Sequence, residues 1–395
     1  MCDTYGVMVY QEDVIKVAHY FADLTLTEAD VLRRGMSGEY RSREEFQRVK
    51  DKFFENCDKI GYEQRVIDRV WFEIESFAGY SFAKGHSASY AVESYQSLYL
   101  KAYYPLEFMV GVINNFGGFY RTEFYFHEAR MNGAQIELPC VNRSDYLTTI
   151  YDDQIYIGFV HLKSLESKVG HQIVAERNQN GEFKSLNNFL SRIPLGLEQM
   201  RILIRIGALR FTGENKQRFL WEAMLFFNEV KVRIPTTAHL FEDIEPKEYP
   251  MPALERTDIE DAFDEIELLG FPLCDPFQLL ATKNFGDTKA LELMDKIITN
   301  VTIVGYLVTT KDTRTKSGQT MHFGTFYDCE GQIFDTVHFP NVASKFPFRG
   351  RGFYEIKGKV VEDFGVAMIE VNWMDKLSLI NKKQLPAESF SETRN

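Results

Sequence analysis

The sequence lacks the features that mark membrane-spanning, exported and disulfide-stabilised proteins. No apolar run approaches the ~18 residues that a membrane-spanning helix needs, and the chain does not open on a charged and then apolar signal peptide. Its 395 residues contain only five scattered cysteines and no Cys-x-x-Cys pair. We therefore expect neither a structural zinc site nor a disulfide framework, no membrane partner, and a location in the reducing cytoplasm.

Positive charge is also in short supply. Lys and Arg number 45 against 57 Asp and Glu, which gives a formal net charge of -12 at pH 7. Taken over the whole chain, this balance argues against nucleic acid as a partner. Net charge averages over domains, however, and local basic patches decide where DNA binds. The length and the 45% hydrophobic content allow two or three domains with cores of their own.

One segment, residues 77–105, combines small, basic and aromatic residues in the run FAGYSFAKGHSASYAVESYQSLYLKAYYP. Small residues let a backbone approach a ligand closely, and Lys84 and His86 can supply charge or donors to phosphate. A helix that begins just after them, near Ser87 or Ser89, would point unpaired N–H groups at an anion. The segment is typical of a phosphate-binding surface.

The first part of the chain has the hydrophobic period of helices. Helices are predicted at Gln11–Leu24, Leu26–Met36, Ser42–Asn56, Glu63–Phe77 and Tyr90–Ala102. Thr27 is the expected N-cap of the second helix. A short strand at Gln154–Phe159 then precedes two helix-turn-helix units. Residues 231–262, with prolines and an acidic cluster, are interpreted as a linker, and Asp264–Asp295 as a short helical segment.

From Ile297 the hydrophobic period changes to two. The predicted strands are Ile297–Thr310, Thr320–Tyr327, Gln332–His338, Gly352–Val361 and Val366–Trp373, with a short helix at Val342–Phe346. Five strands with a helix between the third and the fourth predict an OB-fold barrel. The fold class is therefore multidomain α+β, with a mostly helical part followed by a C-terminal five-stranded β-barrel. The polar residues 381–395 are expected to be a disordered tail.

Three motifs and the late barrel resemble the C-terminal half of the bacterial DNA polymerase III alpha subunit, a C-family replicative polymerase. The motifs are TYGVMVYQEDV from Thr4, ADVLRRGM from Ala29 and FAGYSFAKGHSASYAVESYQSLYLKAYYPLEFM from Phe77, in the order of the family. The resemblance covers nearly the whole chain. It implies a helical fingers domain (1–138), a helix-hairpin-helix region (139–230), a linker with short helices (231–296), an OB-fold (297–380) and the tail.

The resemblance also implies that the catalytic centre is absent from this sequence. The family's palm precedes the TYGVMVYQE motif, and its aspartates bind the metal ions that two-metal phosphoryl transfer requires. The acidic pair Asp152-Asp153 is interpreted as an exposed turn. We therefore expect no catalytic residue, no metal site and no bound cofactor here, while the complete polymerase needs Mg²⁺. The chain is either a fragment or one piece of a divided polymerase, whose palm-containing part is a partner.

By the same resemblance, Arg33 and Arg34 of LRRGM bind the triphosphate of the incoming deoxynucleotide. Lys84 and His86 of KGHSASYA contact that nucleotide or the template strand. A solvated basic helix end is the alternative for the two arginines, since cations there also suit the helix dipole. Structural or solvated roles are the alternative for Lys84 and His86.

The helix-hairpin-helix region departs from the family in its first hairpin. There Ser164 and Glu166 stand where the family has glycines whose backbone N–H groups hold a duplex phosphate. Lys163 and Lys168 remain as candidate DNA contacts. The second unit keeps Gly207-Ala208 and is interpreted as a structural hairpin.

Two further binding segments follow from the family pattern. Leu240 and Phe241 of TAHLFEDI match the apolar end of a sliding-clamp motif, although a threonine replaces its leading glutamine and such a pair also arises by chance. In the OB-fold, the first loop holds three basic residues, Lys311, Arg314 and Lys316.

Aromatic residues on the strand after that loop suit single-stranded DNA. Strand alternation puts Phe323 and Tyr327 on one face and Phe326 on the other, without saying which face is outside. Two functions stay open: a part of a DNA polymerase that binds primer-template and nucleotide, or a non-catalytic DNA-binding accessory protein built from polymerase-derived modules.

Overall fold

The computed structural model describes residues 1–36, 43–76, 83–232 and 257–380. Within these ranges, none of the helices has the length and apolar character that a membrane crossing requires. The chain forms two compact units, Met1–Tyr103 and Tyr104–Asn395. The predicted clamp-binding residues, Leu240 and Phe241, and the predicted tail lie outside the described residues.

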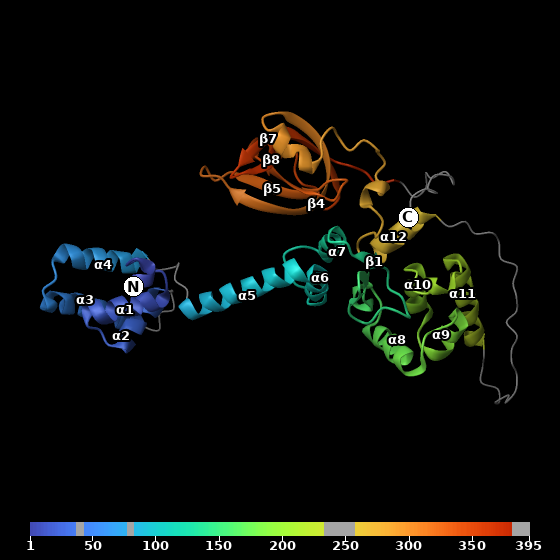
Figure 1. The fold of residues 1–395 in the computed structure, drawn as a ribbon, viewed down its shortest axis with the longest axis horizontal. Helices are drawn as coiled ribbons and strands as arrows, with labels where there is room; N and C mark the ends of the chain where they lie inside the picture. The colour runs from blue at the N-terminus through green and yellow to red at the C-terminus, as the bar shows by residue number, and fades with distance from the viewer. Residues whose placement is uncertain (37–42, 77–82, 233–256, 381–395) are drawn as a thin grey trace. The chain divides into compact units, whose positions relative to one another are not determined.

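The N-terminal unit is helical (Figure 1). Its elements are η1 Cys2–Thr4, α1 Gln11–Ala22, α2 Leu26–Met36, α3 Arg43–Ile60, α4 Gln64–Ser76 and α5 Lys84–Tyr103. Helices α1 to α4 share one apolar core that is centred on Phe53, Leu32 and Trp71. The predicted helices are confirmed, with ends that differ by a few residues, because each has an apolar face at helical spacing.

The start of α2 corrects the sequence-based prediction of its cap. Thr25, not Thr27, precedes the helix: its Oγ1 accepts from the Glu28 backbone N–H at 3.3 Å, and the Glu28 carboxylate accepts from the Thr25 N–H at 3.0 Å. This reciprocal pair is a capping box. Glu28 also pairs with Lys52 of α3 at 2.7 Å, and the Lys52 ammonium followed by Thr25 lowers the pKa of Glu28 to about 2. The cap therefore also ties α2 to α3.

Helix α5 begins at Lys84, earlier than the predicted start at Tyr90 or the opening expected near Ser87 or Ser89. The Glu12 carboxylate of α1 accepts from the Lys84 backbone N–H through both oxygens, at 3.0 and 2.9 Å. A carboxylate at this place satisfies an otherwise unpaired N–H and suits the helix dipole. The first N–H that was expected to face a phosphate is thus held by a side chain of the same unit.

The C-terminal unit begins with helices, a small sheet and the hairpin region. Its elements are α6 Pro105–Asn114, α7 Thr122–Met131, β1 Gln135–Glu137, β2 Thr149–Tyr151, β3 Gln154–Tyr156, η2 Phe159–His161, α8 Ser167–Asn180, α9 Leu186–Arg192, α10 Leu197–Arg205, η3 Arg210–Thr212, α11 Lys216–Val232 and α12 Asp258–Leu268. The sheet order is β1-β3-β2, with β1 parallel and β2 antiparallel to β3. Asp152 has a φ of 55° in the exposed turn between β2 and β3, as the turn interpretation predicted.

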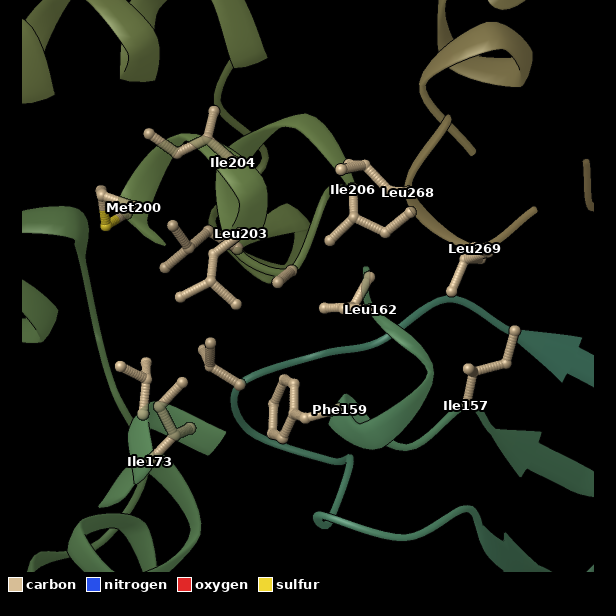
Figure 2. Close-up of a cluster of buried hydrophobic side chains, with 14 of the residues drawn as sticks. Ile157, Phe159, Leu162, Ile173, Met200, Leu203, Ile204, Ile206, Leu268 and Leu269 are labelled. Carbon is tan, nitrogen blue, oxygen red and sulfur yellow. The ribbon is translucent and has the colours of Figure 1, made fainter. Parts of the chain in front are cut away.

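One apolar core joins the hairpin region to both flanking segments. Figure 2 shows Phe159 and Leu162 below α10, with Leu268 and Leu269 beside them. Met109 of α6 and Phe126 of α7 belong to the same core. The predicted fingers domain, 1–138, therefore extends past the junction of the two compact units, because α6 and α7 bury their apolar faces here.

One boundary of the predicted linker also differs. Helix α12 starts at Asp258, inside the range 231–262 that the sequence marks as linker. Thr257 caps it, since its hydroxyl accepts from the Glu260 N–H at 3.3 Å, and acidic residues fill the first turn. The acidic cluster that suggested a linker, Glu242, Asp243 and Glu245, lies outside the described residues.

The C-terminal part of this unit is a closed barrel, shown in orange and red in Figure 1. It consists of β4 Asn300–Arg314, β5 Thr320–Tyr327, β6 Ile333–His338, α13 Pro340–Lys345, β7 Phe353–Asp363 and β8 Val366–Lys376, preceded by η4 Pro276–Leu279 and η5 Ala290–Lys296. The strand order is β4-β5-β6-β8-β7, and β6 runs parallel to β8. With α13 between the third and fourth strands, this is the predicted OB-fold.

Candidate nucleic-acid interface

The first hairpin, residues 162–166, connects η2 to α8 and contains a strained serine. Ser164 has a φ of 64°, the left-handed region that glycine adopts more easily. The hairpin is fixed to the end of α12, because the Lys163 backbone N–H donates to the Leu268 carbonyl at 2.8 Å. The backbone therefore makes a left-handed turn here although the residue is serine.

A glutamine side chain from α10 forms hydrogen bonds with the backbone of this hairpin. The Gln199 side chain accepts from the Glu166 N–H at 2.7 Å and donates to the Ser164 carbonyl at 3.0 Å. An open groove of about 430 Å³ lies here between the starts of α8 and α10, with Lys168 in its lining. Gln199 takes the backbone N–H of Glu166, while the side chains of Lys163 and Lys168 are exposed and stay candidates for a phosphate contact.

We expect Ser164→Gly to raise the free energy of unfolding by about 0.5–1 kcal/mol, because it removes the left-handed strain while adding some chain entropy. Urea unfolding of the two proteins measures the difference. Ser191→Gly, near the end of α9, is the matched control and should lower stability by about 0.5–1 kcal/mol. Equal losses in both variants would contradict the strain at Ser164.

The second hairpin is structural, as interpreted from the sequence. Gly207 has a φ of 75°, and the Ala208 N–H donates to the Leu203 carbonyl at 2.9 Å. The Ala208 carbonyl accepts from the Val141 N–H at 3.0 Å. Both polar groups of Ala208 are thus used within the fold.

The barrel resolves which face of β5 points outward. Phe326 is fully buried inside the barrel, where it packs on Phe334. Phe323 and Tyr327 lie on the outer face, but Tyr327 is covered by Phe124 of α7 and Phe277 of η4, and this burial raises its pKa. Phe323, which is 36% exposed, is the aromatic ring of this strand that remains available for stacking.

The basic residues of the barrel lie mostly on a strand, not in a loop as predicted. Strand β4 continues to Arg314, so that Lys311 and Arg314 belong to it and Lys316 alone is in the turn. Lys311 pairs directly with Phe323 across the β4–β5 ladder. All three basic side chains are exposed. A cation beside an exposed ring is an arrangement that suits a single-stranded nucleic acid.

In the N-terminal unit, Arg33 and Arg34 share one carboxylate. Arg33 Nε and Arg34 Nη2 each lie 2.8 Å from an oxygen of Asp30. Arg33 Nη1 also donates to Gln11 Oε1 at 2.9 Å. The two side chains are 25% and 34% exposed, and Arg34 Nε is a buried donor without a hydrogen-bond partner among the described residues. Asp30 therefore holds both guanidiniums at the end of α2.

The start of α1 brings these arginines and Lys84 together. Gln11 accepts from Arg33, its neighbour Glu12 accepts from the Lys84 N–H, and the Lys84 ammonium lies 5.6 Å from the centre of the Tyr10 ring. His86 does not join them: it is exposed on another face of α5 and contacts Tyr90 edge-on at 4.5 Å. Arg33 thus contacts Gln11, Lys84 contacts Glu12 and Tyr10, and Arg34 is linked to Arg33 through Asp30; we name Arg33, Arg34 and Lys84 the basic surface around residues 10–12.

Comparison with known proteins decides the family. The model of the bacterial DNA polymerase III alpha subunit finger domain matches residues 1–61, and that of the helix-hairpin-helix motif matches residues 133–219. The DNA polymerase III alpha subunit of Treponema pallidum is 32% identical over 86% of this chain, and that of Aquifex aeolicus is 29% identical over 98%. This chain belongs to the DNA polymerase III alpha family. It corresponds to the C-terminal part of the subunit and spans 30% and 32% of the length of these two relatives.

A third alpha subunit, from Thermus aquaticus, is 34% identical over 54% of this chain and 18% of its own length. Among solved structures, the second OB-fold domain of replication protein A from Methanococcus maripaludis is 17% identical, with a TM-score of 0.16, over 23% of this chain and 91% of that domain. The OB-fold assignment rests instead on the strand order of the barrel.

Three residues that position the candidate groups were not predicted from the sequence. Asp30 pairs with Arg33 and Arg34, Glu12 holds the Lys84 backbone N–H, and Gln199 bonds to the hairpin backbone. Glu12 lies inside the TYGVMVYQEDV motif, so the motif itself could have indicated it. Gln199 acts on a turn 33 residues away and has no local signal.

Proposed function

We propose that this chain is the fingers, helix-hairpin-helix and OB-fold part of a DNA polymerase III alpha subunit, and that it binds primer-template DNA and the incoming deoxynucleotide during DNA replication. The observation that carries the proposal is the order of three modules in one chain: the finger match, the hairpin match and the closed barrel. Relatives that are themselves alpha subunits speak against the alternative of an accessory protein.

Each module has a distinct task in this proposal. Lys163 and Lys168 contact duplex phosphates beside the first hairpin, and the barrel holds the single strand with its exposed ring and cations. The basic surface around residues 10–12 receives the triphosphate. The palm with its Mg²⁺ ions belongs to the missing part of the polymerase, and we place the action of the assembly in the cytoplasm. Docking of Leu240 and Phe241 to a sliding clamp remains a prediction.

The DNA-binding proposal is tested by titrating labelled primer-template, duplex and single-stranded oligonucleotides at two salt concentrations. We expect weak binding that falls as salt rises, despite the net charge of -12, because the basic groups are local. An absence of binding to all three DNAs at low salt contradicts the proposed function.

Replacement of Lys311, Arg314 and Lys316 by alanine should lower the slope of log affinity against log salt for single strands by about 2, since each phosphate contact contributes ~0.7. The matched control removes three other barrel cations, Lys345, Lys357 and Lys359, and should change the slope by less than about 0.7. Equal changes in the two triple variants would show that total charge, and not the β4–β5 hairpin, sets the affinity.

A further inference from the structure

Helix α7 is fixed to the barrel through a buried carboxylate. Glu123, whose side chain is only 7% exposed, pairs with Arg121 at 2.5 Å and with Arg351 of the barrel at 3.5 Å. The Tyr306 hydroxyl donates to it at 3.4 Å, and Arg121 Nη2 donates to the Leu307 carbonyl at 3.0 Å. The buried carboxylate positions the guanidiniums of Arg121 and Arg351, whose side chains are 38% and 44% exposed.

Arg351 also connects the barrel to the first hairpin. Its Nη2 donates to the Gly270 carbonyl. Lys163 of the hairpin approaches the same residue, since its Nζ lies 3.3 Å from the position that a Cβ at Gly270 would take. Gly270 lies two residues after Leu268, whose carbonyl accepts from the Lys163 backbone N–H. A cation of the hairpin and a cation of the barrel therefore flank one glycine.

Two more basic residues continue this surface along the barrel. Lys376 Nζ donates to the Arg349 carbonyl at 2.9 Å, and its Cε lies 2.9 Å from the Cβ position at Gly352. The Arg349 guanidinium pairs with Asp375 and is 57% exposed. We name this set the bridge surface; its basic members are Arg121, Lys163, Arg349, Arg351 and Lys376.

The bridge surface has an excess of positive charge in a negative chain. Its contacts join five basic residues to two carboxylates, Glu123 and Asp375, an excess of three charges, while the whole chain has a net charge of -12. Like charges repel one another, so their gathering on one surface costs free energy unless an anion binds there. Arginine guanidiniums in such a place suit phosphate oxygens, which they hold through two parallel hydrogen bonds.

We propose that the bridge surface binds the sugar–phosphate backbone of DNA between the hairpin and the barrel. The inference rests on the proposed function, in which the hairpin contacts duplex and the barrel contacts the single strand. Lys163 belongs to the hairpin and Arg351 to the barrel, so the surface is continuous with both. A primer-template, which contains a duplex, a junction and a single strand, engages all three at once, whereas a duplex or a single strand alone engages one end.

The experiment compares the wild-type chain with the Arg351→Gln/Lys376→Gln double variant by fluorescence anisotropy, on primer-template, duplex and single-stranded DNA. We expect the variant to bind primer-template about tenfold more weakly, with a salt slope smaller by about 1.5–2, since two phosphate contacts are lost. Binding to duplex alone and to single strand alone should change less than about twofold. The matched control, Lys345→Gln/Lys359→Gln, removes the same charge from the barrel and should leave the primer-template affinity within about twofold.

Equal primer-template affinity of the wild type and the double variant overturns the inference, while the wild type's binding to DNA keeps the proposed function intact. If the wild type binds none of the three DNAs, the proposed function itself fails. Polyglutamate of matched charge is the competitor: displacement as effective as that by DNA would point to an acidic protein and overturn the inference.

A second variant is needed because Arg351 also contacts Glu123 and Gly270, so that its replacement can impair folding. The Lys376 ammonium donates to one exposed carbonyl, so Lys376→Gln alone should keep the melting temperature and weaken primer-template binding about threefold. A change below about 1.5-fold in a stably folded Lys376→Gln protein decides against the bridge surface.

Discussion

Primer extension by this chain alone should remain at background with Mg²⁺ and all four deoxynucleotides. The resemblance places the metal-binding aspartates in the palm, which precedes the TYGVMVYQE motif, and the relatives are about three times as long as this chain. Two-metal phosphoryl transfer needs those ligands. Addition of the palm-containing segment, fused in front of Met1 or supplied separately, should raise the extension rate by at least about 10³-fold, the scale on which electrostatic stabilisation of phosphoryl transfer acts.

The control for this prediction uses the acidic pair in the turn between β2 and β3. Asp152→Asn/Asp153→Asn keeps the left-handed turn, which asparagine tolerates, and removes both charges. The double variant should extend primers as well as the wild type when the palm is present. Robust extension by the clean wild-type chain without a palm, lost in the double variant, would mean that this pair is catalytic and that the assignment of the palm is wrong.

Local periodicity was sufficient to predict most elements of the fold. Strand β5 has the bounds that the sequence predicts, Thr320–Tyr327, because alternation is strong and the flanking turns contain glycine. The helices around Phe53 and Leu32 were predicted because each repeats an apolar residue every three to four positions. The family motifs added the order of the modules, which no periodicity contains.

The remaining features depend on contacts between distant residues. Strand β1, of three residues, is too short to show a period and exists through its parallel pairing with β3. Glu12 sets the start of α5 from 72 residues away. Helix α7 packs against two parts of the chain, with Phe126 in the hairpin core and Phe124 against the barrel. Its own sequence does not indicate which part it packs against.

The candidate site also has features that the sequence predicts and features that depend on distant contacts. The residue types were predictable, since arginine and lysine suit phosphate whatever their partners are. Their present partners were not: Asp30 neutralises part of the charge of Arg33 and Arg34, and Gln199 occupies the hairpin. Both partners make polar contacts that an arriving phosphate would have to replace, which lowers the net gain from binding.

Loss of one guanidinium from the basic surface around residues 10–12 should impair nucleotide use far more than DNA binding. With the palm present, we expect Arg34→Ala to lower kcat/KM for the deoxynucleotide about 10- to 100-fold, because hydrogen bonds to charged groups contribute about 1.5–3 kcal/mol. The Arg34 side chain is 34% exposed, so a triphosphate oxygen has access to its guanidinium. Steady-state primer extension at varied nucleotide concentration measures the effect.

Three controls separate a nucleotide grip from a loss of charge or of folding. Arg34→Lys keeps the charge but loses the planar fork, and should fall between the wild type and Arg34→Ala. Arg48→Ala removes an exposed arginine from α3 of the same unit and should leave kcat/KM within about twofold. Asp30→Asn releases both guanidiniums from their carboxylate and should not weaken nucleotide use. If Arg34→Ala weakens primer-template binding as much as nucleotide use, or if Arg48→Ala has the same effect, the arginines act through general electrostatics, and the nucleotide grip is wrong.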